Sequence, residues 1–211
     1  MKLFLFGVTG NAGQAILQEA LSRGHSVTAA ARQTGFFHPV GKANVVASDA
    51  LGTAALKDVI KGHDAVIVAI SGRKSGHDTV AKIAGNLLAA LPAAGVSRLL
   101  WVGGAGSLEV APGVRLVDTP QFPAIYKEEA LAQGAALQTL RDSGTALNWT
   151  YVSPPAMIGV GGRTGSYRTG GDKLLADANG VSTISWIDYA VAIIDELEKN
   201  AHPKKRITVA Y

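Results

Sequence analysis

Three glycines at three-residue spacing lie close behind the start methionine, in the stretch FGVTGNAGQ. Glycine inside regular structure costs up to about 1 kcal/mol relative to alanine, so three together indicate a backbone that turns tightly or lies against a ligand. The apolar run before them predicts a strand, and the residues after them predict a helix capped by Asn11. Such a turn directs backbone N–H groups and a helix N-terminus at one place, which attracts a pyrophosphate. We therefore predict a dinucleotide site whose residues are Gly7, Thr9, Gly10, Asn11, Ala12 and Gly13.

The end of the second predicted strand indicates which dinucleotide is bound. NAD sites usually place Asp or Glu there, on the 2′-hydroxyl of the ribose. This chain has Arg32, whose guanidinium would pair with a 2′-phosphate that a carboxylate would repel. The sequence thus favours NADP(H), with NAD(H) less favoured. The alternative is that Arg32 is an ordinary surface residue of a loop.

Alternating strands and helices must position these residues. Their pattern predicts an α/β fold of the Rossmann type, doubly wound, with a mainly parallel sheet covered by helices on both faces. We expect one domain over 1–211, in which 154–185 form a small C-terminal cap on the substrate side. Strands are expected at 2–6, 25–32, 43–49, 63–71, 97–107, 146–155, 180–185 and 206–210, and helices at 12–23, 53–60, 78–90, 124–141 and from 186. The stretch 108–123 is expected to be a loop.

Composition excludes several classes of site. The chain has 211 residues, of which 47% are hydrophobic and 17% charged, as is typical of a globular domain. It has no cysteine, so disulfides and cysteine-based metal sites are excluded, and its five histidines show no metal-ligand spacing. The net charge is +4, but the basic residues are scattered, and we interpret the run 204–206 as a solvated turn. We predict no metal, no nucleic-acid partner, no membrane segment and a cytoplasmic location.

The chain resembles a known family along nearly its whole length. The stretches GVTGNAGQ, AAAR, WVGGAGSL, VRLVDTPQFPAIYKEEALAQ, WTYVSPP and RTGSYRTGGDKLL carry the resemblance. They are similar to atypical short-chain dehydrogenase/reductases of the NADH-flavin reductase group, relatives of biliverdin reductase B and of NmrA-like proteins. The resemblance implies a nicotinamide cofactor and hydride transfer to a flavin, quinone or similar planar acceptor.

The resemblance also extends the cofactor site beyond the glycine turn and Arg32. It implies contacts along the ends of later strands, with 153–155 closing the nicotinamide end. Asp49 has two readings, as an acceptor for the adenine amino group or as a cap of the following turn. The additional cofactor residues are Asp49, Ala50, Leu51, Ala69, Ile70, Ser71, Gly72, Gly103, Gly104, Ala105, Lys127, Ser153, Pro154 and Pro155.

One departure from the family concerns catalysis. Standard short-chain dehydrogenases have Tyr-x-x-x-Lys, in which the lysine lowers the pKa of the tyrosine. Here Tyr126 is followed four residues later by Ala130, and the adjacent Lys127 does not face it on a helix. Alcohol oxidation is therefore disfavoured, whereas reduction of a flavin-like ring needs position more than an enzyme acid. The catalytic candidates are Ser107, Tyr126 and Lys127, each with a purely structural alternative.

The acceptor is expected in a cleft between the strand ends and the loop 159–171. Tyr167 and Arg168 are the predicted substrate residues, and Arg163 and Arg168 could attract an anionic acceptor such as FMN. The leading hypothesis is an NADPH-preferring reductase, and the alternative is an NADP(H)-binding redox sensor of the NmrA-like type. A nucleotide-sugar epimerase is less favoured because it needs the Tyr–Lys pair. The chain would be a monomer or a homodimer, since the alanine-rich face of helix 124–141 permits packing against a copy.

Overall fold

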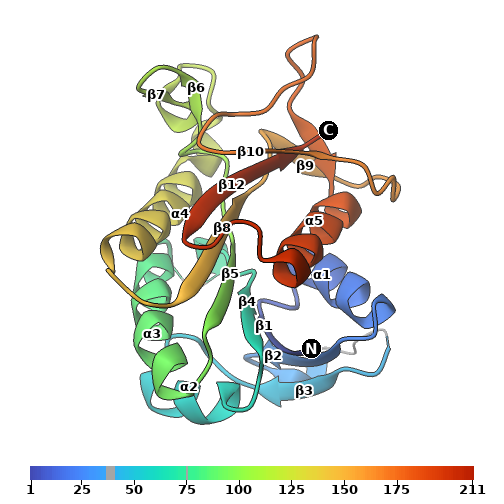
Figure 1. Cartoon of the computed structure of the whole chain (residues 1–211). Helices are drawn as coiled ribbons and strands as arrows, with labels where there is room; N and C mark the ends of the chain where they lie inside the picture. The colour runs from blue at the N-terminus through green and yellow to red at the C-terminus, as the bar shows by residue number, and fades with distance from the viewer. Residues whose placement is uncertain (37–40, 75) are drawn as a thin grey trace.

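The centre of the fold is an eight-stranded sheet in the order β10-β12-β8-β5-β4-β1-β2-β3 (Figure 1). A computed structural model describes residues 1–36, 41–74 and 76–211. Each described strand pair of this sheet is parallel except β10–β12, which is antiparallel. The part β3-β2-β1-β4-β5 has the Rossmann order, so the predicted fold class is confirmed. The strands are β1 Lys2–Phe6, β2 Ser26–Ala31, β3 Asn44–Ala47, β4 Ala65–Val68, β5 Arg98–Val102, β8 Asn148–Ser153, β10 Arg168–Gly170 and β12 Lys205–Ala210.

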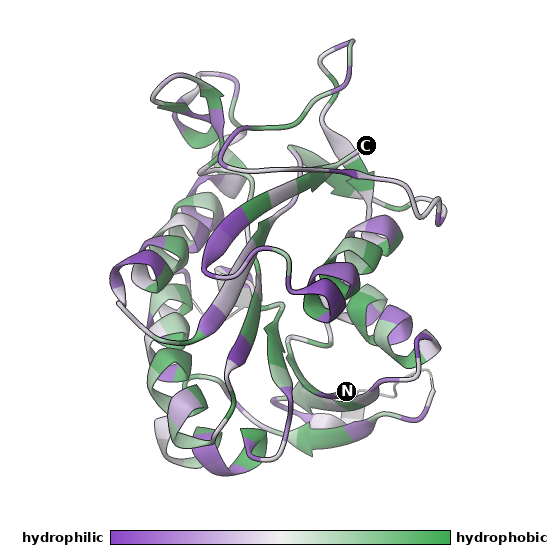
Figure 2. Cartoon of the chain, viewed as in Figure 1, coloured by the Kyte–Doolittle hydropathy of each residue, from purple (hydrophilic) through white to green (hydrophobic). Residues whose placement is uncertain are grey.

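Helices cover both faces of the sheet because successive strand residues point to opposite sides. In β1, Phe4 and Phe6 pack against α2 Thr53–Ile60, α3 Thr79–Ala93 and α4 Ala124–Asp142. Leu3 and Leu5 pack on the other side against α1 Asn11–Ser22 and α5 Trp186–Lys199. Figure 2 shows α4 and α5 with hydrophobic residues on one side and hydrophilic residues on the other. This two-sided burial explains the continuously apolar strands of the sequence.

The alanine-rich face of α4 is used within the chain. Ala132 and Ala136 are buried in the core beneath the sheet, and Ala130 is 9% exposed. Of the four alanines that were expected to permit packing against a copy, only Ala135 is exposed. The small side chains of this face are thus used within the chain, where α4 packs closely against α3.

Several short elements were not predicted. The stretch expected to be a loop contains a hairpin of β6 Glu109–Ala111 and β7 Val114–Arg115, turning at Gly113 with φ +72°. In the glycine-rich part, the unpredicted β9 Met157–Gly159 pairs with β11 Thr183–Ser185, which lies within the strand expected at 180–185. Strands of two or three residues have no periodicity to detect, and their pairing depends on partners distant in sequence.

The basic run near the C-terminus is not the solvated turn that was expected. Arg206 lies inside β12 and is 7% exposed. Its Nε donates to Asp172 Oδ1 at 2.6 Å. Lys204 and Lys205 are exposed as expected, but the prediction is wrong for Arg206, whose buried guanidinium pairs with the exposed carboxylate of Asp172, 34 residues earlier.

Candidate cofactor and substrate site

A cleft of about 950 Å³ lies at the carboxyl ends of β1, β2, β4, β5 and β8. Its volume is near the upper end of the range for cofactor sites, about 300–1,000 Å³. Ligands of open parallel sheets bind at this edge. The predicted residues that line it are Gly7, Thr9, Gly10, Asn11, Ala12, Arg32, Asp49, Ala50, Ala69, Ile70, Ser71, Gly103, Gly104, Ala105, Tyr126, Pro154 and Pro155.

The glycine turn is shaped by two very close backbone approaches. Gly7 has φ +81°, and a Cβ placed on it would lie 2.2 Å from the carbonyl oxygen of Ala69 at the end of β4. A Cβ on Gly13 would lie 2.2 Å from the carbonyl oxygen of Gly7, so α1 rests directly on the turn. A Cβ on Gly10 would have only one neighbour, at 3.6 Å. Gly7 and Gly13 therefore build the turn, whereas Gly10 faces the cleft.

The N-terminus of α1 suits an anion. Gly10, not Asn11 as predicted, is the N-cap, and it provides no side-chain hydrogen bond. The first turn of the helix contains no acidic residue. Backbone N–H groups that no side chain caps, together with the positive end of the helix dipole, fit a pyrophosphate. A glycine cap is the reason that the Asn11 prediction fails.

The adenine end of the cleft is formed by the ends of β2 and β3. Arg32 follows β2 directly, is exposed and lines the cleft. Asp49 also lines it, and its Oδ1 accepts a hydrogen bond of 3.0 Å from the backbone N–H of Leu51. This bond matches the turn-capping interpretation of Asp49, while its exposure leaves the carboxylate accessible to a base. Leu51 packs against the core instead of the cleft.

The side chain of Tyr151 supports the part of the cleft that follows the end of β5. A Cβ on Gly103 would lie 2.0 Å from the Tyr151 ring, so only glycine fits there. The Tyr151 hydroxyl accepts from Gly104 N at 3.0 Å and donates to the carbonyl of Gln133 at 3.0 Å. Burial raises the pKa of Tyr151 strongly, so the phenol stays protonated and keeps both bonds. Sequence reasoning missed Tyr151 and Gln133, since a polar group inside an apolar strand gives no signal of its partner.

The opposite wall of the cleft is apolar and aromatic. Tyr126 is 47% exposed at its edge, and the guanidinium of Arg73 lies 5.3 Å from the centre of its ring. Ala130, at the place of the family lysine, lines the cleft, whereas Lys127 does not. The remaining apolar lining of the cleft consists of Leu116, Phe122, Pro123, Met157, Ile158 and Trp186, of which Trp186 begins α5, on the other face of the sheet from α4. These surfaces suit the face of a flat ring.

Two predicted hydroxyl groups lie away from the cleft. Ser107 Oγ and Ser153 Oγ each lie 3.5 Å from Arg206 Nη1, and Ser153 is fully buried. The buried guanidinium thus occupies the space beside both hydroxyls. Gly72 is also outside the cleft lining, and its N–H donates to Glu129 Oε2 at 2.9 Å. Glu129, which lines the cleft, was missed because only the fold brings α4 beside the end of β4.

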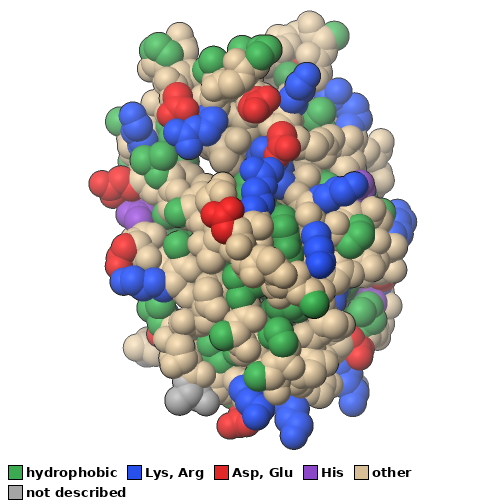
Figure 3. Space-filling view, turned by 60° about the vertical axis from the view of Figure 1, so that its left-hand side comes forward, with side chains coloured by type: hydrophobic (Ala, Val, Ile, Leu, Met, Phe, Trp, Pro, Cys, Tyr) green, Lys and Arg blue, Asp and Glu red, His purple; other side chains and the backbone are tan. Residues whose placement is uncertain are grey.

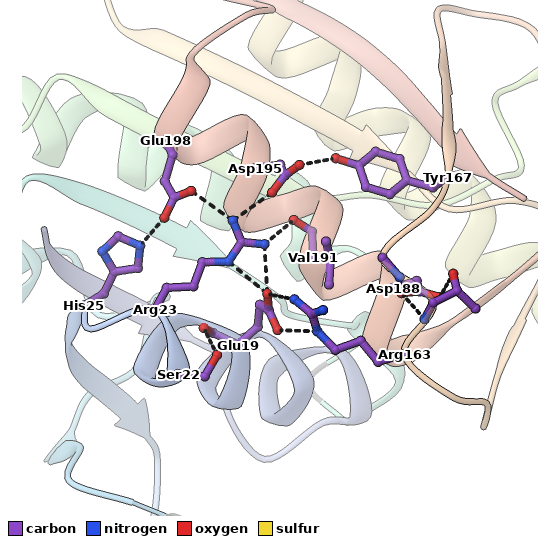
Figure 4. Close-up of polar contacts among 12 residues, drawn as sticks. Glu19, Ser22, Arg23, His25, Arg163, Tyr167, Asp188, Val191, Asp195 and Glu198 are labelled. Atoms are coloured by element: carbon purple, nitrogen blue, oxygen red, sulfur yellow. Dashed lines mark hydrogen bonds and ion pairs between the residues drawn. The ribbon is translucent and has the colours of Figure 1, made fainter.

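The predicted substrate residues of the glycine-rich segment also lie outside the cleft lining. The Tyr167 hydroxyl donates to Asp195 at 2.8 Å, and Arg163 Nη2 donates to Glu19 at 2.9 Å (Figure 4). Arg168 Nε donates to the main-chain oxygen of Tyr211 at 3.0 Å. These side chains point to α1, α5 and the C-terminal strand because their acidic and carbonyl partners lie there. The loop expected over the cleft instead lines a separate pocket of about 330 Å³.

We call the acidic residues that hold this segment the cap anchor: Glu19, Asp188 and Asp195. Asp188 is fully buried and accepts hydrogen bonds from Thr164 N, Thr164 Oγ1, Gly165 N and the Tyr211 hydroxyl. Burial opposes ionisation of all three carboxyls, but their hydrogen bonds outweigh it and lower each pKa, that of Asp195 to about 2. Residues 163–167 of this segment are therefore fastened to the Rossmann core by hydrogen bonds to these carboxylates.

Comparisons with known proteins agree with this geometry. The family described as NAD(P)H-binding matches residues 7–200. The chain belongs to this family. Three similar solved structures carry different provisional names: an exported protein from Burkholderia pseudomallei, an NADH-flavin reductase from Streptococcus pneumoniae and an epimerase from Bacteroides thetaiotaomicron. The Burkholderia protein is 41% identical with a TM-score of 0.91, the Streptococcus protein 38% with 0.87, and the Bacteroides protein 37% with 0.91. Each match covers 100% of this chain, and it covers 100%, 99% and 96% of the three proteins in the same order.

One face of the molecule carries side chains of both charges. On the face shown in Figure 3, acidic and basic side chains are interspersed instead of grouped by sign. Within the described ranges, no helix is long and apolar enough to cross a membrane. Over the same residues, no cluster of His, Asp and Glu has the arrangement of a metal site. The cleft is therefore the feature from which a function can be argued.

Proposed function

We propose that this NAD(P)H-binding protein is an NADPH-preferring reductase that transfers a hydride to a flavin, a quinone or a similar planar acceptor. One observation carries the proposal. A single cleft joins an anion-binding glycine turn, with Arg32 beside it, to an apolar wall that contains Tyr126 but no lysine four residues on. When bound, a reduced nicotinamide supplies the hydride, and the aromatic wall orients the ring that receives it.

The residues of the cleft favour this chemistry over oxidation of an alcohol. Removing an alcohol proton needs a positioned base, and Tyr126 has no lysine four residues on to act with it. A flavin or quinone ring takes up hydride when it is held parallel to the donor, and solvent can supply the proton. Proximity and orientation therefore account for the expected rate enhancement.

The first test measures the loss of reduced-nicotinamide absorbance with purified protein. FMN, riboflavin and a small quinone are supplied separately, with NADPH or NADH as donor. Protein-dependent decay with NADPH supports the proposal and ranks the acceptors. No decay, together with tight NADPH binding in the same preparation, would favour the non-catalytic redox sensor, which the missing Tyr–Lys pair also fits.

One substitution tests the preference for NADPH over NADH. A charge-assisted bond from Arg32 to a 2′-phosphate is worth roughly 1.5–3 kcal/mol, about ten- to a hundredfold in affinity. Arg32→Asp should weaken NADPH binding by about this factor and leave NADH binding within severalfold. Equal or better turnover with NADH in the parent protein would show that Arg32 does not select the cofactor.

A further inference from the structure

One cation in the cleft is not used by the proposed cofactor contacts. Arg73 follows the end of β4, is exposed and lines the cleft. Its guanidinium lies 5.3 Å from the centre of the Tyr126 ring, within cation–π range. The contact holds a long side chain on the aromatic wall.

The arginine has no acidic partner among the residues that the structure describes. Glu129 is the carboxylate that lines the same part of the cleft, and both of its oxygens are engaged. Oε2 accepts from Gly72 N at 2.9 Å, and Oε1 accepts from Gln133 Nε2 at 3.0 Å. The five N–H donors of Arg73 therefore remain available for a ligand.

Arg163 and Arg168, which were predicted to attract an anionic acceptor, bind other groups of the chain. Arg163 is paired with Glu19, and Arg168 donates to the main-chain oxygens of Tyr211 and Ala176. Arg73 is thus the arginine that lies against the apolar wall, where a planar ring would rest. The pyrophosphate of the cofactor already has the N-terminus of α1 at the glycine turn.

We propose that Arg73 binds an anionic group, phosphate or carboxylate, carried by the planar acceptor, and so selects charged rings over neutral ones. This inference rests on the proposed function, because it names the class of acceptor for the same cleft. A guanidinium pairs with either anion through two parallel hydrogen bonds. The expected preference for a charged acceptor over its neutral form is about ten- to a hundredfold in affinity.

Binding can be measured without turnover. Flavin fluorescence is titrated with the protein in saturating NADP⁺, using FMN and riboflavin as the phosphorylated and neutral probes. Wild type should bind FMN at least about tenfold more tightly. Arg73→Gln should lose this preference while riboflavin affinity stays unchanged, and Arg73→Lys should retain part of it. Lys61→Gln, which removes an exposed positive charge at the end of α2, is the control and should leave the ratio as in wild type.

A second pair, an anthraquinone carboxylate and its neutral amide, distinguishes carboxylate from phosphate as the anion, with quenching of protein fluorescence as the readout. A preference in either pair that Arg73→Gln abolishes supports the inference. It is overturned if wild type shows no preference in both pairs, or if Arg73→Gln weakens charged and neutral probes alike. It is also overturned if the variant weakens NADP⁺ binding with the probe ratios unchanged, which would place Arg73 on the cofactor. Failure of the reductase proposal appears separately, as absence of NADPH consumption.

Discussion

The two later glycines of the turn should respond in opposite ways to the same small change. A Cβ on Gly13 would lie 2.2 Å from the carbonyl oxygen of Gly7 and 2.8 Å from the Cα of Val8. Both are backbone atoms, which cannot rotate away as a side chain can. A Cβ on Gly10 would meet a single atom at 3.6 Å, an ordinary contact, and Gly10 has φ −89°, which alanine adopts freely. Gly13→Ala should therefore disturb the fold, and Gly10→Ala the ligand site.

The magnitude follows from two opposing effects. Alanine inside a helix gains about 1 kcal/mol over glycine. Overpacking a tight core costs about 1–3 kcal/mol, occasionally more, and a contact more than 1 Å too short against backbone belongs at the upper end. Gly13→Ala should lower the free energy of unfolding by about 2 kcal/mol, which for a domain of this size lowers Tm by about 4–8 °C. Gly10→Ala should leave Tm within about 2 °C of wild type.

Two assays separate these effects. Urea unfolding reports stability, and enhancement of NADPH fluorescence reports cofactor affinity at a temperature where both variants are folded. Gly10→Ala should weaken NADPH binding at least tenfold, since its methyl group would stand in the cleft between the helix N-terminus and the phosphates. The reasoning is refuted if Gly13→Ala is as stable as wild type, or if Gly10→Ala binds NADPH normally.

Three further predictions concern the supports of the cleft. Asp188→Asn should lower the free energy of unfolding by about 3 kcal/mol, because a buried carboxylate that accepts four hydrogen bonds becomes an amide with two donors; a urea midpoint equal to that of wild type would contradict this. Tyr151→Phe should cost about 1–3 kcal/mol in the same assay and weaken NADPH binding, since Gly104 N and the Gln133 carbonyl lose their partner. The carboxylates of the cap anchor have lowered pKa values in the folded state, so their stabilisation is complete above about pH 5 and is lost as the pH falls toward about 2. Urea midpoints measured between pH 3 and pH 7 should fall on the acid side, and a flat profile would refute this assignment.

The sheet and the cofactor half of the cleft were predictable because their signals are local. Each central strand is a short apolar run, and the glycine motif joins the first of them to a helix, so neighbouring residues carry both the element and its role. Arg32 and Asp49 could be placed at the cleft because parallel strands bring their carboxyl ends to one edge. The family resemblance placed 103–105 there, at the end of β5.

The substrate half was not predictable in the same way, because its partners are distant in sequence. Arg163 pairs with Glu19 across 144 positions, and Arg206 with Asp172 across 34. In a glycine-rich segment no periodicity tells which way a side chain points. An arginine or tyrosine there is equally compatible with a ligand and with a structural anchor until the acidic partner is located. Here Tyr167 donates to Asp195, Arg168 donates to the main-chain oxygen of Tyr211, and the arginine beside Tyr126 in the cleft is Arg73 instead.

Position 130 can hold a lysine that acts with the tyrosine, as in the family, or a small side chain that leaves the cleft open, as in this chain. Ala130 lines the cleft, is 9% exposed, and packs so near Gly106 that a Cβ on that glycine would lie 2.6 Å from its own. A lysine at 130 would have to extend its side chain along the apolar wall, into volume that is now open to an acceptor. The alanine thus lacks the amine of the family lysine and keeps the wall flat. An apolar surface with Arg73 at its edge suits binding of a ring by its face and of an anion at its margin, which is the combination that the proposed reduction of a charged planar acceptor needs.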